Sequence, residues 1–118
     1  MPVLRESSTG KFIVYGLQYV NGWIFNWVKW NSATSSNSSS TAFNAMAPGF
    51  SPLVFLRVTD DGTNLKFAVS ADGQDFTYQL TTESRTALMA GGPNQIGIGA
   101  DSNNSSPVII TAVHWDVA

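Results

Sequence analysis

The stretch that decides the fold is Leu-Arg-Val-Thr-Asp-Asp-Gly-Thr-Asn-Leu-Lys-Phe (residues 56–67), which runs into Ala-Val-Ser-Ala-Asp-Gly-Gln-Asp-Phe (residues 68–76). Asp-Asp-Gly-Thr-Asn and Ala-Asp-Gly-Gln are turn sequences, because Asp and Asn side chains bond their own backbone. Each turn lies between short runs that alternate apolar and polar residues. The stretch therefore predicts an antiparallel meander with strands near residues 53–59, 64–70 and 75–80.

A hairpin is predicted upstream of this meander. Residues 12–20 and 23–30 are rich in aromatic and β-branched side chains, and an Asn-Gly pair separates them. Asn-Gly favours a two-residue turn, which fixes the pairing of the two strands. The predicted pairs are Val20 with Trp23, Gln18 with Phe25, Gly16 with Trp27, and Val14 with Lys29.

That register predicts two different faces for the hairpin. The more apolar face is the expected core and carries Ile13, Tyr15, Leu17, Tyr19, Ile24, Val28 and Trp30. The other face mixes aromatic and polar side chains: Gln18, Trp23, Phe25, Trp27 and Lys29. Sugar rings stack their C–H faces on aromatic rings while amides bond the hydroxyls, so this second face is the predicted glycan-binding site. The alternative is that it packs against a second sheet or a neighbouring subunit.

The remaining segments complete an all-β pattern. Residues 31–41 are a polar low-complexity run, either a loop or a solvent-facing edge strand. Residues 82–90 are expected to form a short helical turn or an irregular corner. Further strands are expected at 95–100 and 108–117, with a loop between them. About eight strands without a long helix predict one domain over residues 1–118, an antiparallel jelly-roll β-sandwich.

Composition excludes several classes of protein. Charged residues make up 12% of the 118 residues, and the net charge is −2 with only six scattered Lys and Arg, so no nucleic-acid footprint is present. The chain has no cysteine, which excludes disulfides, thiolate catalysis and cysteine-based zinc sites. Residues 1–11 are polar and no apolar run approaches ~18 residues, so neither a signal peptide nor a membrane span is expected.

Catalytic chemistry is not expected. Glycoside hydrolysis needs two paired carboxylic acids, whereas the two glutamates, Glu6 and Glu83, are isolated in the sequence. The only histidine, His114, is two residues from Asp116 on a predicted strand, which is typical of an ordinary strand histidine beside a carboxylate. We therefore expect no catalytic residues.

No cofactor is expected, and calcium is the one alternative left open. Calcium binds to loops rich in oxygen ligands, and several aspartates lie in predicted turns. Asp is also a default turn residue, and no EF-hand spacing is present. The candidate ligands are Asp60, Asp61, Asp72, Asp75 and Asp101.

Five segments carry a resemblance to a known family. They are Ser-Ser-Thr-Gly-Lys-Phe (7–12), Trp27 to Trp30-Asn31-Ser32, and the stretches 56–67, 70–76 and 95–104. In these segments the chain resembles the C-terminal portion of a concanavalin A-like (laminin G-like) jelly roll from tail and fibre-type virion proteins of bacterial viruses. In that family several strands precede the Ser-Thr-Gly-Lys turn, so the jelly roll is expected to be incomplete at its N-terminus.

The resemblance implies a function and a setting. It implies a non-catalytic virion module, such as a tail fibre, spike or decoration protein, located on a virion or otherwise extracellular. The expected partners are further copies of the chain, other virion proteins and a cell-surface glycan, because the open edges of an incomplete jelly roll favour association. The alternatives are a lectin-like carbohydrate-binding module and an accessory domain of a carbohydrate-active enzyme.

Overall fold

All regular structure in the described part of the chain is β-strand. The computed structural model describes residues 1–19, 23–44, 55–76 and 78–100. The strands are β1 (Pro2–Arg5), β2 (Phe12–Tyr19), β3 (Trp23–Ser32), β4 (Ser35–Asn44), β5 (Phe55–Asp60), β6 (Asn64–Ser70), β7 (Tyr78–Ser84) and β8 (Gln95–Ile98). The predicted all-β class is therefore confirmed.

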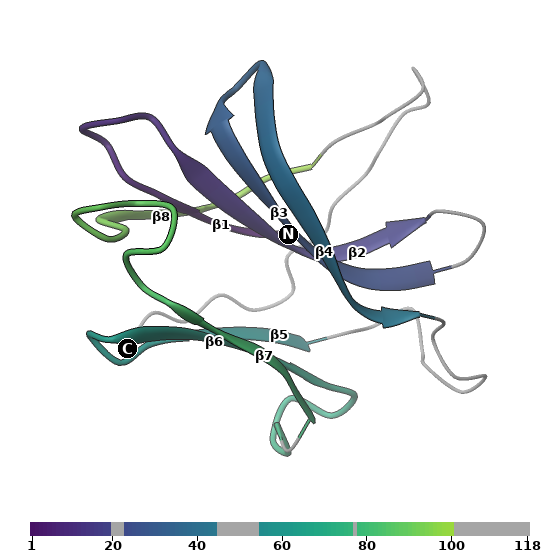
Figure 1. Ribbon diagram of the computed structural model, residues 1–118. Coiled ribbons are helices and arrows are strands. Elements are labelled where there is room, and N and C mark those ends of the chain that lie inside the picture. The colour runs from purple at the N-terminus through teal and green to yellow at the C-terminus, as the bar shows by residue number, and fades with distance from the viewer. Residues whose placement is uncertain (20–22, 45–54, 77, 101–118) are drawn as a thin grey trace.

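The strands form two antiparallel sheets that lie as the two layers of a β-sandwich (Figure 1). The larger sheet has the order β4-β3-β2-β1-β8, and the smaller has the order β5-β6-β7. The smaller sheet is the meander predicted from residues 56–76, and its pairing confirms that prediction. The loop and closing strand predicted at 101–117 lie outside the described residues, and the jelly-roll connectivity stays a prediction.

The first turn of the meander shows why its sequence predicted the fold. Asp60 Oδ1 accepts a hydrogen bond from the Gly62 amide at 3.0 Å. Asp61 Oδ1 accepts hydrogen bonds from the amides of Thr63 at 3.0 Å and Asn64 at 2.7 Å. Gly62 has a φ of 86°, a conformation that glycine adopts without steric cost. The turn is thus built from local contacts that the sequence alone specifies.

The described core is centred on an aromatic contact between the sheets. Phe67 on β6 is fully buried, and its ring lies 4.9 Å from that of Tyr15 on β2. The Tyr15 hydroxyl donates a hydrogen bond to the Ala68 carbonyl oxygen at 3.1 Å, so it joins the two layers. Burial raises the pKa of Tyr15, which therefore stays neutral. The other buried members of the cluster are Leu4, Ile13, Leu65, Leu88 and Met89.

The hairpin register differs from the predicted one by a single residue. Tyr19 pairs with Trp23, and Tyr15 pairs with Trp27, so three residues rather than two separate the paired ends of β2 and β3. A slip of one residue moves every side chain of a strand to the other face. The face predicted for β2 is correct, since Ile13 and Tyr15 are buried, but the face predicted for β3 is wrong.

Packing across the sandwich explains the observed register. Phe67 contacts both Tyr15 and Trp27, which requires these two side chains to share the inner face of the large sheet. Phe25 lies on the same face and is 2% exposed. The burial of these rings outweighs the local preference of Asn-Gly for a two-residue turn.

The structure assigns three segments whose conformation was open or unassigned in the sequence analysis. Residues 2–5, which were assigned to no strand in the sequence analysis, form β1, which lies between β2 and β8. Most of the polar run 31–41 belongs to β4, an edge strand, so the edge-strand alternative is the correct one. β7 continues to Ser84, and the rest of the segment 82–90 is an irregular corner rather than a helical turn.

Candidate functional site: the outer face of the large sheet

The predicted glycan-binding face lies mostly inside the sandwich. Phe25 is buried, and Trp27 is half-buried with its ring stacked on Phe67 at 6.3 Å and 11°. The indole Nε1 of Trp27 is also buried, and it has no hydrogen-bond partner among the described residues. The Lys29 ammonium lies 2.6 Å from Glu83 Oε1 on β7, so it joins the two sheets. These three residues therefore support the fold and offer no stacking surface.

The other two residues of that predicted site are placed only by their backbone. Gln18 pairs with Ile24, and Trp23 pairs with Tyr19, so they no longer share a face. Their side chains lie outside the described part of the structure. The predicted set is therefore not brought together as one exposed face.

The same change of register creates a different row of side chains on the outer face. Arg5 pairs with Gln95 on one side and with Phe12 on the other, and Phe12 pairs with Trp30. Trp30 in turn pairs with Ser36 on β4. Because paired residues share a face, these side chains cross all the strands of the large sheet in one line, ~4.8 Å apart. We call this the outer-face row: Gln95, Arg5, Phe12, Trp30 and Ser36.

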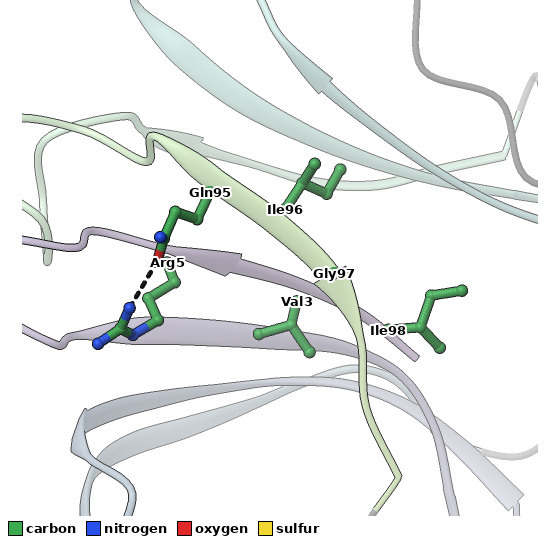
Figure 2. Close-up of a pocket in the computed structure, with 6 residues that line it drawn as sticks. All are labelled: Val3, Arg5, Gln95, Ile96, Gly97 and Ile98. Atoms are coloured by element: carbon green, nitrogen blue, oxygen red, sulfur yellow. Dashed lines mark hydrogen bonds between the residues drawn. The ribbon is translucent and has the colours of Figure 1, made fainter.

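The outer-face row combines an aromatic centre with polar ends. The rings of Phe12 and Trp30 are parallel, with centroids 5.8 Å apart and an interplanar angle of 6°, and both side chains are half-buried. Arg5 Nη1 donates a hydrogen bond to Gln95 Oε1 at 2.5 Å (Figure 2). Among the described residues, the ion pairs involve Lys29, Lys66 and Arg85. The Arg5 guanidinium therefore has no carboxylate partner in this part of the chain.

A shallow hollow of about 450 Å³ adjoins the polar end of the row. It follows β8 and β1, and Figure 2 shows its side chains. Ile96 and Ile98 are 48% and 46% exposed, the largest exposures of any bulky apolar side chain among the described residues. Ile96 pairs with the buried Leu4, which places both isoleucines on the inner face beyond the cover of the smaller sheet. The residues around the hollow are Val3, Arg5, Gln95, Ile96, Gly97 and Ile98.

The four described calcium candidates do not converge. Asp60 and Asp61 belong to the β5–β6 turn, whereas Asp72 and Asp75 belong to the β6–β7 turn. These turns are at opposite ends of β6, a seven-residue strand that spans about 20 Å. Asp101 lies outside the described residues. Within those residues, no group of three His, Cys, Asp or Glu side chains is arranged to hold a metal ion.

The partners of Asp60, Asp61 and Asp72 show the structural role of these carboxylates. Asp60 accepts hydrogen bonds from Arg85 Nε at 3.0 and 2.8 Å. Asp61 lies 2.7 Å from the Lys66 ammonium, and this contact and two backbone amides lower the pKa of Asp61 to about 2. Asp72 accepts hydrogen bonds from the amides of Asp75 and Gln74 and from the Ser70 hydroxyl, which lower its pKa to about 2. These carboxylates stabilise the turns, and two of them, Asp60 and Asp61, form salt bridges.

Glu6 has a structural role of the same kind. Its carboxylate accepts hydrogen bonds from the Thr9 hydroxyl and the Gly91 amide, each at 2.5 Å, and the residue is 3% exposed. These bonds tie the β1–β2 turn to the corner that precedes β8, and they lower the pKa of Glu6 below its ordinary value. His114 and Asp116 lie outside the described residues.

Comparison with known proteins adds no further information on the site. No family model, curated protein or solved structure matches the chain. The resemblance to concanavalin A-like virion domains therefore stays a prediction. No helix among the described residues is long and apolar enough to cross a membrane.

The outer-face row could not be predicted from the sequence, because the two-residue turn favoured by Asn-Gly gives a different pairing of β2 with β3. Trp30 was predicted for the core, and Arg5 was not assigned to a strand. One signal was available, because Val3 and Leu4 are adjacent apolar residues, one of them β-branched, and such residues are enriched in strands. A three-residue loop between β2 and β3 would then have placed Phe12 beside Trp30.

Proposed function

We propose that this chain is a non-catalytic module of a bacteriophage virion protein that adheres to polysaccharide on the host surface. The observation that carries the proposal is the outer-face row, in which a parallel Phe12–Trp30 pair lies beside the Arg5–Gln95 hydrogen bond. The resemblance of five sequence segments to tail and fibre-type domains supports the virion setting. The two-layered all-β fold is compatible with both.

The chemistry of the row suits a sugar chain. The rings of Phe12 and Trp30 offer an apolar surface for the C–H faces of pyranose rings. Gln95 and Ser36 are exposed and carry an amide and a hydroxyl that can bond sugar hydroxyls. Arg5 adds a positive charge with no carboxylate partner among the described residues, which favours a polysaccharide that bears uronic acids.

The row also supports a binding role without catalysis. It contains no carboxylate, whereas glycoside hydrolases place two carboxyl groups ~5–9.5 Å apart around the scissile bond. Glu6 and Glu83, the only glutamates of the chain, are held in a turn and in a salt bridge between the sheets. A shallow row gives weak single contacts, so adhesion would depend on many copies acting together.

Binding of two soluble polysaccharides tests the role of the row. We expect affinity electrophoresis to show retardation of the protein by polygalacturonate and, more weakly, by dextran. Trp30→Ala should weaken both interactions about 5-fold or more, since the loss of a ring contact worth about 1 kcal/mol changes Kd by that factor. Arg5→Gln should weaken binding to polygalacturonate and leave binding to dextran unchanged.

A matched control separates the row from general charge effects. Arg57 is also exposed, but it lies on the smaller sheet, with its guanidinium 3.7 Å above the Phe76 ring. Arg57→Gln should leave both polysaccharide interactions unchanged. Equal losses in the Arg5 and Arg57 variants, or retardation by neither polymer, would reject the row as the binding site. Immunogold labelling of purified phage particles tests the virion setting, which fails if the particles carry no label.

A further inference from the structure

The edges of the two sheets are not equally protected against pairing with another strand. Proteins block exposed edges with charged side chains, bulges or irregular pairing. β4 has three shifts of register against β3, and β5 carries the charged Arg57 and Asp60. β7 carries Glu83, and its pairing with β6 has one shift of register.

β8 has none of these features. Residues 94–100 contain no charged side chain, and the pairing of β8 with β1 is regular along its whole length. Within the described residues, β8 is the end strand of its sheet and carries the exposed Ile96 and Ile98. An uncharged, regular edge with an apolar flank is the kind of edge to which another strand adds readily.

The side chains of β8 are arranged symmetrically about Gly97. Ile96 and Ile98 flank this glycine and point to the same face. Antiparallel pairing of β8 with the same strand of a second copy, around a two-fold axis at Gly97, would place each Ile96 opposite an Ile98. A Cβ added at Gly97 would meet no atom within 4 Å, so the side-chain space at the axis is open. The strand is therefore complementary to itself.

We propose that two copies of this chain pair through β8, with Gly97 at the two-fold axis. The five described strands of each copy would then form one continuous sheet of ten. The axis of such a pair is perpendicular to the sheet, so both outer faces point in the same direction. The role of the dimer rests on the proposed function, because the dimer would present two outer-face rows to one polysaccharide surface.

The dimer is expected to be weak in solution. β8 has four residues, and its pairing buries less than the ~800 Å² per partner of stable complexes. Burial of the four isoleucines and the new backbone hydrogen bonds favours association. Two outer-face rows on one dimer would nevertheless strengthen adhesion, since bivalent binding raises apparent affinity about 10²-fold or more.

Disulfide cross-linking tests the geometry directly. The chain has no cysteine, so a Gly97→Cys variant carries a single thiol. Residues directly opposite in an antiparallel pair have Cα atoms about 4.5–5.5 Å apart, within the range that a disulfide spans. We expect mild oxidation to convert this variant to a covalent dimer on a non-reducing gel at micromolar concentration.

Two other edges provide the matched controls. Ser38→Cys on β4 and Thr59→Cys on β5 place a thiol on exposed residues of the competing edges. Both should cross-link at least 10-fold more slowly than Gly97→Cys. If all three variants cross-link at the same rate, or Gly97→Cys stays monomeric, the proposal is overturned.

A second variant separates this proposal from the proposed function. The double substitution Ile96→Lys and Ile98→Lys places like charges opposite each other across the axis, so sedimentation should show a monomer. Retention on a dextran-coated surface should fall about 10-fold or more with the loss of bivalent binding, whereas affinity for soluble dextran stays unchanged. Trp30→Ala should lose dextran and keep the Gly97→Cys cross-link. A cross-linked dimer that binds no polysaccharide would reject the function and leave the dimer standing.

Discussion

At the scale of single residues, the described core depends on how three aromatic rings meet between the sheets. Phe67 contacts Tyr15 on β2 and Trp27 on β3, and the Tyr15 hydroxyl bonds the Ala68 carbonyl on β6. Tyr15 is 1% exposed and Phe67 is fully buried, so water cannot replace these contacts. Tyr15 therefore contributes both ring packing and one hydrogen bond between the layers.

Removing only the hydroxyl should have a modest effect. Tyr15→Phe keeps the ring contact with Phe67 and loses the bond to Ala68, which should lower the free energy of unfolding by about 1 kcal/mol. Phe67→Ala removes the ring that both partners contact and should cost about 3–5 kcal/mol. Urea denaturation measures both changes. Equal losses in the two variants would show that the hydroxyl, rather than the ring, dominates the contact.

At the scale of elements, the two turns of the meander use the same backbone conformation in different surroundings. Gly62 in the β5–β6 turn has a φ of 86°, and Gly73 in the β6–β7 turn has a φ of 77°. A Cβ added at Gly62 would meet nothing within 4 Å, whereas at Gly73 it would lie 3.0 Å from the Phe55 ring. A side chain at Gly62 would therefore meet backbone strain alone, whereas a side chain at Gly73 would meet backbone strain and a steric contact with Phe55.

Alanine substitution at the two glycines should reveal this difference. Gly62→Ala should lower the free energy of unfolding by about 1–2 kcal/mol, the cost of a left-handed conformation for a residue with a Cβ. Gly73→Ala should cost more, because Phe55 must also move. Thermal denaturation compares the two variants. A Gly73 variant as stable as the Gly62 variant would contradict the predicted contact.

The same elements show which parts of the fold the sequence could predict. The meander was predictable because Asp60, Asp61 and Asp72 make their turn contacts within a few residues. The pairing of β2 with β3 was not, because Phe67, more than 35 residues away, decides which face of β3 is buried. The candidate site followed the register, so the prediction located aromatic residues on β3 but chose Phe25 and Trp27 instead of Trp30.

At the scale of the whole molecule, acidic side chains in several turns make stability depend on pH. Glu6, Asp61 and Asp72 all have a lowered pKa, because hydrogen bonds and, for Asp61, Lys66 stabilise the carboxylate. A group with a lower pKa in the folded state contributes stability above its unfolded pKa and loses that contribution as pH falls through the folded pKa. The three turns should therefore weaken together in acid.

Stability should fall steeply in acid, from about pH 4.5 to about pH 2. Thermal denaturation at a series of pH values measures the fall. Asp72→Asn keeps an acceptor oxygen but cannot titrate, so its profile should be flatter between pH 4 and pH 2 than that of the original protein. A thermal midpoint that does not change with pH over this range would show that the three carboxylates have the same pKa in the folded and unfolded states.

The pairing of β1 with β8 has a consequence for synthesis. Residues 2–5 pair with residues 95–98, so the described large sheet is complete only after almost the whole described chain has left the ribosome. At ~5–20 residues per second, β1 waits roughly 5–20 s for this partner. During that time β1 leaves one row of backbone groups open on the nascent chain. Folding should therefore finish late, and chaperones that shield extended segments should raise the yield of native protein.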